Sequence, residues 1–373
     1  IAGLLSEVSL QSARRLAEST YSRVVDTLDL SDKRRPDQQL DSIARSRPDL
    51  VVLTGGTDGG ASRSMLKMLE AVGLACYLMP AEKRPMVLYA GNHKLANDVR
   101  ELLGGHAGKL QISPNVRPSL EVEDLEPASN VLASLVTNLR QRQIKGVDEL
   151  YNWSSGNLLP TAYAQGRMIR FLSRLYESTR GLLSVNMGAS ASTVAAGFNG
   201  ELTLGVYPQF GLGENLGAIL QHTEIEQIMR WMQLDISSNT LREFLFQKSL
   251  YPSTIPATQD ELAIMQAITR QALYLAVRAA RTNFPASAHA ARTDLMPKLD
   301  LLIAGGGAIA DNGSVGQSLL LLLDAIQPVG IMPFLLDQNN LLPMLGAAAT
   351  RSNYLPVQVI ESAQALGDLV AGY

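Results

Sequence analysis

The sequence predicts an α/β protein with a mixed, largely parallel sheet, and two features carry that prediction. Short apolar segments of strand type alternate with longer segments of helical periodicity through the first half of the chain. Glycine-rich loops directly follow three of the apolar segments. The length of 373 residues favours two domains, because single domains usually hold about 50 to 250 residues.

The first half of the chain contains most of the expected alternation. A strand at 49–53 runs into the glycine loop Thr54–Gly60, and a helix follows at once. Arg47-Pro48 ends the preceding helix, because the residue before a proline avoids helical geometry. In chain order we expect a helix at 9–22, a strand at 24–28, a helix at 37–45, strands at 49–53, 85–90 and 110–113, and helices at 62–72, 96–103 and 127–139.

The second half is expected to contain a β-hairpin followed by further helices and strands. Asn199-Gly200 is the strongest short hairpin signal, because both residues tolerate positive φ. Pro252–Thr258 is a proline-bearing loop. We expect helices at 160–175, 225–232, 260–281 and 314–323, strands at 182–187, 192–198, 201–205, 300–304, 333–337 and 357–360, a small-residue helix near 346–349, and a last helix ending near residue 370.

The stretch from Leu182 to Gly205 is the most informative part of the chain. Its first turn carries only small residues after Met187, so backbone N–H groups can approach a ligand closely. Hydroxyls on the turn supply further donors. We therefore expect Gly188, Ser190, Ser192 and Thr193 to bind phosphate, as in one phosphate hairpin of actin-like ATPases. The alternative is a tight β-turn that merely requires small residues.

Two other glycine loops support a ligand site. Gly55–Gly60 lies between a strand and a helix, the local form of an anion site, but it matches neither a Rossmann motif nor a P-loop. Gly305, Gly306 and Gly307 follow a buried strand and would let a flat adenosine lie against the backbone. Together the three loops predict a cleft between domains that holds phosphates and a base.

Composition excludes several classes of function. Charged residues make up 18% of the chain without a Lys/Arg-rich run, so nothing electrostatic favours nucleic acid or an anionic membrane. Cys76 is the single cysteine, which excludes a disulfide framework or a cysteine-rich metal site and fits a reducing, cytoplasmic setting. The four histidines lack ligand spacing, so no metal site is expected. The oligomeric state is left open.

Several segments resemble one known family in order along nearly the whole chain. They are SLQSARRLAEST, DLVVLTGGTDGGAS, MVLYAGNHKLANDV, NVRP, VNMGASASTVAAGFNGE, LLIAGGGAIAD and LLPMLGAAA. The chain resembles the glutamate mutase accessory protein family, also called the MutL or glutamate mutase L family. That family is placed in the superfamily of actin, heat-shock chaperones and sugar kinases. LTGGTDGG is the most specific of the matching segments.

The resemblance implies two ribonuclease-H-like domains around a nucleotide cleft. Domain I would cover 1–180, domain II 181–356, and a strand and helix would close the chain at 357–373. It implies ATP with Mg²⁺ as the ligand, and a role in protecting or reactivating a cobalamin-dependent mutase. Asn186, Gly188, Ser190, Ser192 and Thr193 would face phosphate, and Gly305, Gly306 and Gly307 would face adenosine.

The chain departs from the family pattern in two places. Family members open with a strand and a Gly-Ser-Thr turn, the first phosphate hairpin, and nothing before Ser9 supplies it. The chain begins at Ile1, so we expect it to be a fragment with an incomplete first domain. Asn186 stands where the family carries an aspartate. An amide cannot accept a proton or offer a charge to a Mg²⁺-bound water, so ATP hydrolysis should be weak or absent.

Three functions remain open at this stage. The first is an ATP-binding accessory protein for a cobalamin enzyme. The second, favoured by Asn186, is a degenerate relative that binds a partner without turnover. The third is a small-molecule kinase of the same superfamily, for which Asp58 is the only attractive candidate for a catalytic aspartate, although a solvated turn aspartate is the better explanation of that residue.

Overall fold

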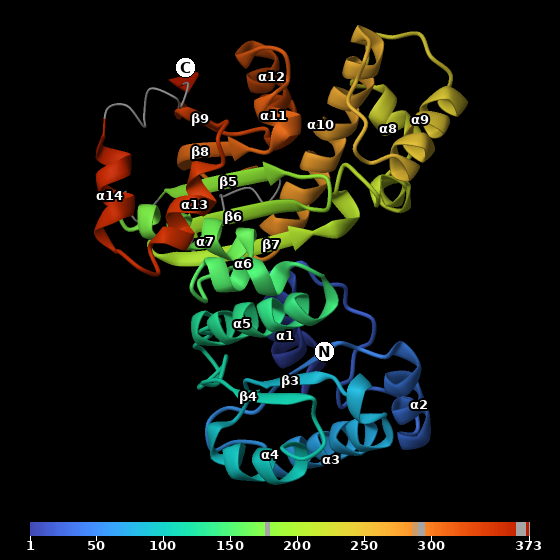
Figure 1. Cartoon of the computed structure of the whole chain (residues 1–373), viewed down its shortest axis with the longest axis vertical. Helices are drawn as coiled ribbons and strands as arrows, with labels where there is room; N and C mark the ends of the chain where they lie inside the picture. Colours follow the sequence, from blue (N-terminus) through green and yellow to red (C-terminus); the bar gives the residue numbers. More distant parts are fainter. Residues whose placement is uncertain (176–179, 286–287, 289–294, 363–370, 373) are drawn as a thin grey trace. The chain divides into compact units, whose positions relative to one another are not determined.

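The computed structural model describes residues 1–175, 180–285, 288, 295–362 and 371–372. The chain divides into two compact units, Ile1–Pro160 and Thr161–Tyr373, each with its own sheet (Figure 1). Helix α7 (Thr161–Ser173) packs on a strand of the second sheet. Residues 161–175 therefore belong to the second unit, whereas the sequence led us to place them in the first.

The first unit contains a four-stranded sheet in which every described pair is parallel. Its order is β1-β2-β3-β4, with bounds Ala2–Gly3, Leu50–Thr54, Met86–Tyr89 and Lys109–Ile112. Leu28 adds one parallel bridge to Ala2, so the strand expected at 24–28 is reduced to this bridge. The described strands of this unit contain no antiparallel pair, so they do not by themselves show the ribonuclease-H-like arrangement that the resemblance implies for the first domain, which we expected to lack its first hairpin.

Helices cover both faces of this sheet, because alternate strand residues project to opposite sides. Val51 and Leu53 join the core beneath α3 and α4, whereas Val52 joins the core beneath α1 and α5. Helix α3 runs to Leu78, beyond the predicted end at residue 72. The helices are η1 (Ser6–Leu10), α1 (Gln11–Glu18), α2 (Pro36–Ser46), α3 (Ser62–Leu78), η2 (Ala81–Lys83), η3 (His93–Leu95), α4 (Ala96–Leu103), α5 (Glu126–Gln143) and α6 (Val147–Trp153).

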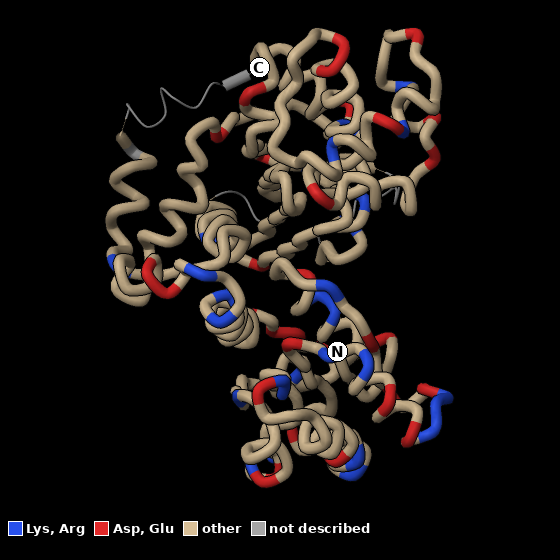
Figure 2. The backbone as a smooth tube through the Cα atoms, turned by 45° about the vertical axis from the view of Figure 1, so that its right-hand side comes forward, with Lys and Arg blue, Asp and Glu red and all other residues tan. Residues whose placement is uncertain are grey.

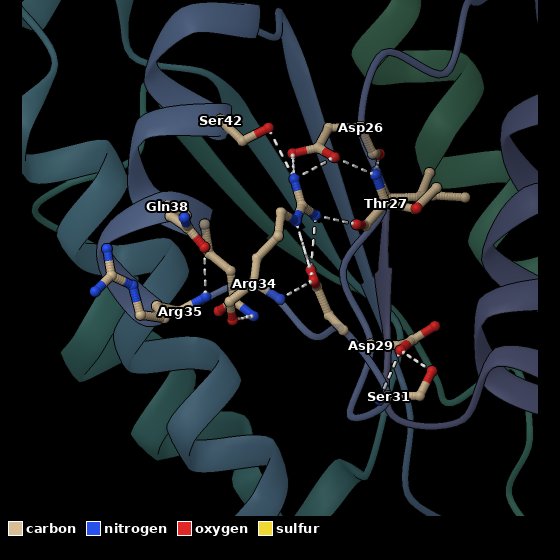
Figure 3. Close-up of polar contacts among 11 residues, drawn as sticks. Asp26, Thr27, Asp29, Ser31, Arg34, Arg35, Gln38 and Ser42 are labelled. Atoms are coloured by element: carbon tan, nitrogen blue, oxygen red, sulfur yellow. Dashed lines mark hydrogen bonds and ion pairs between the residues drawn. The ribbon is translucent and has the colours of Figure 1, made fainter.

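One arginine ties the segment before α2 together. The Arg34 guanidinium donates to the Asp26 carboxylate at 3.0 Å, to the Asp32 carboxylate at 2.7 Å and to the Thr27 carbonyl at 2.7 Å. It also donates to the Ser42 hydroxyl on α2 at 2.8 Å (Figure 3). The segment 24–28, which the sequence predicts as a strand, is therefore irregular and is held in place by Arg34.

The second unit has a mixed six-stranded sheet of order β10-β9-β8-β5-β6-β7. β5, β6 and β7 form antiparallel pairs, β8 and β9 run parallel to β5, and β10 is antiparallel to β9. Asn199-Gly200 forms the predicted turn between β6 and β7, with positive φ at both residues. The bounds are β5 (Gly181–Met187), β6 (Ser192–Phe198), β7 (Glu201–Tyr207), β8 (Leu299–Gly305), β9 (Phe334–Asp337) and β10 (Ala371–Gly372).

Helix α14 (Tyr354–Glu361) corrects one prediction, since residues 357–360 were expected to form a strand. The last predicted helix falls on 363–370, outside the described residues. Helices α8 and α9 lie between β7 and β8, and α9 was not predicted. The remaining helices are η4 (Pro208–Phe210), η5 (Leu216–Gln221), α8 (Ile225–Met229), α9 (Ser238–Leu250), α10 (Gln259–Arg281), α11 (Gly307–Ala310), α12 (Val315–Ile326) and α13 (Leu341–Ala348).

The second sheet also separates two cores. Leu183, Val185 and Met187 pack with residues of α10 and α12, whereas Leu182 packs with α7 and α13 on the other face. Both faces of β5 are therefore buried, and the strand reads as a nearly continuous apolar run. Of its two polar side chains, Ser184 is buried and accepts a hydrogen bond from Gln165, whereas Asn186 lies near the end of the strand, where the candidate site begins.

Candidate functional site

Three parallel strands of the second sheet end side by side. Asn186 on β5 is the register partner of Gly305 on β8, and Gly305 is the register partner of Asp337 on β9. Parallel sheets place the loops that bind ligands at these carboxyl ends. Here the loops are Gly188–Ala191, Gly306–Gly307 and 338–340.

The turn after β5 packs against a further glycine-rich turn, Gly211–Asn215. The N–H of Leu212 donates to the Gly188 carbonyl at 3.0 Å, and the N–H of Gly213 donates to the Ala189 carbonyl at 2.8 Å. A Cβ on Gly211 would lie 2.6 Å from the Ser190 carbonyl carbon, which is too close for any side chain. Gly211 therefore lets two backbone segments pack directly, and this packing fixes the shape of the 188–191 turn.

The loop after β8 crosses directly over β5. Gly306 has a φ of +89°, and a Cβ there would lie 2.8 Å from the Met187 carbonyl carbon. A residue with a side chain would be strained in this conformation and would also collide with β5. Gly307 opens α11 and has room, since a Cβ there would meet only Asp311 Oδ2 at 3.4 Å.

These loops border a cavity of about 900 Å³ within the second unit. Asn186, Gly188, Gly306 and Gly307 line it, and Gly305 at the end of β8 is buried. We expected these residues at a cleft between domains, whereas all the described residues that line this cavity belong to the second unit. The other lining residues are Met187, Ala189, Leu212, Lys248, Pro252, Thr254, Ile255, Pro256, Ala257, Thr258, Gln259, Leu262, Met265, Gln266, Thr269, Ala308, Asp311, Asn312, Gly313 and Asn340.

The three predicted hydroxyl residues have different positions. Ser192 is fully buried, and its hydroxyl donates to the Phe210 carbonyl at 2.6 Å, so it holds the hairpin to the next loop. Ser190 is exposed on the turn. Thr193 is half-buried and is the register partner of Asn186, which places both side chains on one face of the antiparallel pair. None of the three lines the cavity in this structure.

Two polar residues at the strand ends have structural partners. The Asn186 amide donates to Asn340 Oδ1 at 3.4 Å, and Asn340 has a φ of +52°. The buried Asp337 carboxylate accepts the N–H groups of Leu341 at 2.7 Å and Leu342 at 2.9 Å, so it caps α13. No pattern in the sequence indicated this capping role for Asp337.

Asn312 is a site residue that the sequence did not reveal. It is 4% exposed, and its Oδ1 accepts a hydrogen bond from Gln266 Nε2 on α10 at 2.9 Å. Its Nδ2 has no hydrogen-bond partner within the described ranges. A buried donor without a partner is costly, and such groups often mark a place for a water or a ligand. No motif in the sequence could have singled it out.

The cavity carries little charge. Among the described residues, Lys248 and Asp311 are the only ionisable side chains that line it. Burial lowers the pKa of Lys248. The described part of the chain contains no group of three or more His, Cys, Asp or Glu that could hold a metal ion.

Basic and acidic residues are interspersed along the backbone of both units (Figure 2). No helix in the described ranges is long and apolar enough to cross a bilayer.

The third glycine loop, Gly55–Gly60, belongs to the first unit, whereas Gly188 and Gly305 belong to the second. Asp58 in this loop accepts the N–H of His93 and the amide of Asn115, each at 2.9 Å. Asp58 thus joins the loops after β2, β3 and β4. This bonding gives it a structural role, and no contact singles it out as the catalytic base of a kinase.

The fold and the site define an α/β protein of two units, the second with a mixed sheet and a cavity between two glycine turns. A family model described as MutL protein matches residues 1–363, so the chain belongs to the MutL protein family, as its motifs indicated. It is similar to Protein MutL of Clostridium tetanomorphum, with 28% identity over 207 residues. The match covers 53% of this chain and 42% of that protein, less than half of its length.

Proposed function

We propose that this member of the MutL protein family binds a nucleotide in the cavity of its second unit and serves as an accessory protein of a cobalamin-dependent mutase. One observation carries the nucleotide proposal. Asn186, Gly188, Gly306 and Gly307 line the same cavity, although the two glycine turns are far apart in the sequence. The mutase is inferred from the family resemblance, since the family relates to glutamate mutase.

The strand order of the second unit supports this proposal. In the order β7-β6-β5-β8-β9, two antiparallel pairs are followed by two parallel ones, the strand pattern that the family resemblance leads us to expect for a ribonuclease-H-like domain. Actin-like ATPases place phosphate at the β5–β6 type of turn and adenosine at the glycine loop after the β8 type of strand. Gly188 and Gly306 follow the corresponding strands here, and this correspondence supports the proposal.

The residues present suit a nucleoside. A volume of about 900 Å³ falls within the usual range for small-molecule sites. Apolar side chains such as Leu262 and Met265 offer a wall for a base, and the unpartnered Asn312 Nδ2 offers a donor. The bare backbone at Gly306 and Gly307 allows close approach of a flat ring.

A blocking substitution tests the binding proposal. Gly307→Trp should fill the cavity without disturbing the core, because a Cβ at Gly307 makes only an ordinary contact. We expect ATP binding in calorimetry to be lost while the melting temperature changes little. Gly316→Trp on α12 is the matched control, since Gly316 is exposed and does not line the cavity. Unchanged ATP affinity in Gly307→Trp would reject the site.

Asn186 favours a second candidate, a protein of the same fold that binds nucleotide without hydrolysing it. Its amide is hydrogen-bonded to Asn340 and cannot act as a base. We expect wild-type protein to release little phosphate from ATP. A gain of phosphate release in Asn186→Asp would identify a lapsed ATPase, and rapid wild-type hydrolysis would reject this candidate.

The accessory role needs a test of its own. A cobalamin-dependent glutamate mutase inactivated by turnover would be incubated with this protein, with and without ATP. Recovery of mutase activity only in the presence of both would support reactivation. Recovery with protein alone would favour a scaffold that acts by binding.

A further inference from the structure

The amino group of Lys248 holds the loop that forms one wall of the cavity. Lys248 lies in the last turn of α9, is half-buried and lines the cavity. Its Nζ donates to the carbonyl of Pro252 at 2.9 Å and to the carbonyl of Thr254. The ammonium is therefore fixed in place, unlike that of an ordinary surface lysine.

The charge of this ammonium has no acidic partner among the residues that the structure describes. An ammonium has three N–H donors, and the two carbonyls use two of them. No carboxylate lies within 4 Å of Lys248 among the described ion pairs. Burial lowers the pKa of the group, the direction expected where charge is desolvated without an acidic partner. A charge in this setting is stabilised by an anion that enters the cavity.

The loop that the ammonium holds packs near the turn after β5 through Gly213. Pro252, whose carbonyl the ammonium binds, has its Cβ 3.2 Å from the position that a Cβ on Gly213 would take. Gly213 in turn donates to the carbonyl of Ala189 in that turn. The other charged lining residue, Asp311, is at the opposite glycine loop, beside Gly307.

We propose that Lys248 is the phosphate-binding cation of this cavity. Its third N–H donates to a phosphate group of the nucleotide, beside the turn 188–191, while the nucleoside lies toward Gly307 and Asp311. This inference rests on the proposed nucleotide function and adds to it the orientation of the ligand. Because the same ammonium holds Pro252 and Thr254, a bound phosphate also fixes the loop 252–258 more firmly.

The test compares ligands that differ only in phosphate. ATP, ADP and adenosine would be titrated calorimetrically into the full chain as wild type, Lys248→Gln, Lys248→Met and Lys248→Arg. Gln keeps N–H donors for the loop carbonyls but has no charge, and Arg keeps the charge. Lys298→Met is the matched control, because Lys298 is exposed and does not line the cavity. Thermal melts would report whether each variant folds.

We expect ATP affinity to fall by about tenfold or more in Lys248→Gln and Lys248→Met, as loss of a charge-assisted hydrogen bond predicts. Adenosine affinity should stay within about twofold, and Lys248→Arg and Lys298→Met should bind ATP nearly as wild type. An equal loss for adenosine and ATP would mean that Lys248 only supports the loop, and it would overturn the inference. So would unchanged ATP affinity in Lys248→Gln. If the wild type bound neither ligand, the nucleotide function itself would fall and this inference with it.

Discussion

Gly306 crosses Met187 so closely that the two loops of the cavity are packed backbone against backbone. A Cβ on Gly306 would overlap the Met187 carbonyl group, and the positive φ of Gly306 already disfavours any side chain. The shape of the cavity therefore depends on one glycine at the point where β5 and β8 end.

Gly306→Ala should destabilise the second unit. Left-handed strain costs about 1–3 kcal/mol, and the collision with Met187 adds to it. Urea unfolding of wild type and variant gives the difference. Gly316→Ala on α12 is the control and should be neutral or slightly stabilising, because a Cβ there meets only Ser314 Oγ at 3.9 Å. Equal midpoints for wild type and Gly306→Ala would contradict the close crossing.

Ser192→Ala should lower stability without weakening ATP binding. Loss of the Ser192 hydroxyl leaves the Phe210 carbonyl without a hydrogen-bond donor, which should lower the free energy of unfolding by about 1–3 kcal/mol. Urea unfolding and calorimetry of wild type and Ser192→Ala separate the two effects. A loss of ATP affinity in Ser192→Ala would contradict a purely structural role, because Ser192 does not line the cavity.

Arg34→Met should loosen the segment before α2 in the first unit. It removes the donors to Asp26, Asp32, Thr27 and Ser42, and we expect a loss of about 1–2 kcal/mol because the partly exposed ion pairs are screened. Limited proteolysis should then cut residues 26–35 faster. Arg45→Met, whose partner Asp41 is an exposed neighbour on α2, should change neither measurement.

The first unit should lose stability in alkaline solution through Cys76. Burial raises the pKa of this thiol from 9.0 to about 11. The thiol of the unfolded chain ionises at lower pH than the buried thiol of the folded chain. The stabilisation of the folded state by the neutral thiol is therefore complete below pH 9. It is lost as the pH rises to about 11, a decrease of roughly 2–3 kcal/mol in the free energy of unfolding. Burial also raises the pKa of Tyr89 in the same core, which acts in the same direction.

The contribution of Cys76 is isolated by comparison with Cys76→Ala. Urea unfolding would be measured for both proteins between pH 8 and about pH 11, the window set by the shifted thiol. Wild type should lose more stability across this range than the variant, which retains only the effect of Tyr89. Parallel curves would mean that the pKa of the thiol is not raised in the folded protein.

The local sequence pattern was sufficient to predict those strands and turns whose conformation depends mainly on their own residues. The strands at 49–53, 182–187 and 300–304 read as apolar runs, and the Asn199-Gly200 turn was correctly predicted. Pattern failed where tertiary contacts compete with propensity. Val357–Ile360 looked like a strand because of its β-branched residues, yet it lies within α14. The segment 24–28 became a loop held by Arg34.

The family, the alternation of strands and helices, and the small-residue turns were determined by the sequence alone, because each depends on residues that are neighbours along the chain. The tertiary structure decided which turns meet. Register places Asn186 beside Gly305, and the crossing of Gly306 over Met187 closes the site, so Gly188 and Gly307 share a cavity while Gly55 belongs to the other unit. It also decided that Ser192 holds the core and that Lys248 and Asn312 face the cavity. Those roles arise from contacts between distant segments, which no local pattern encodes.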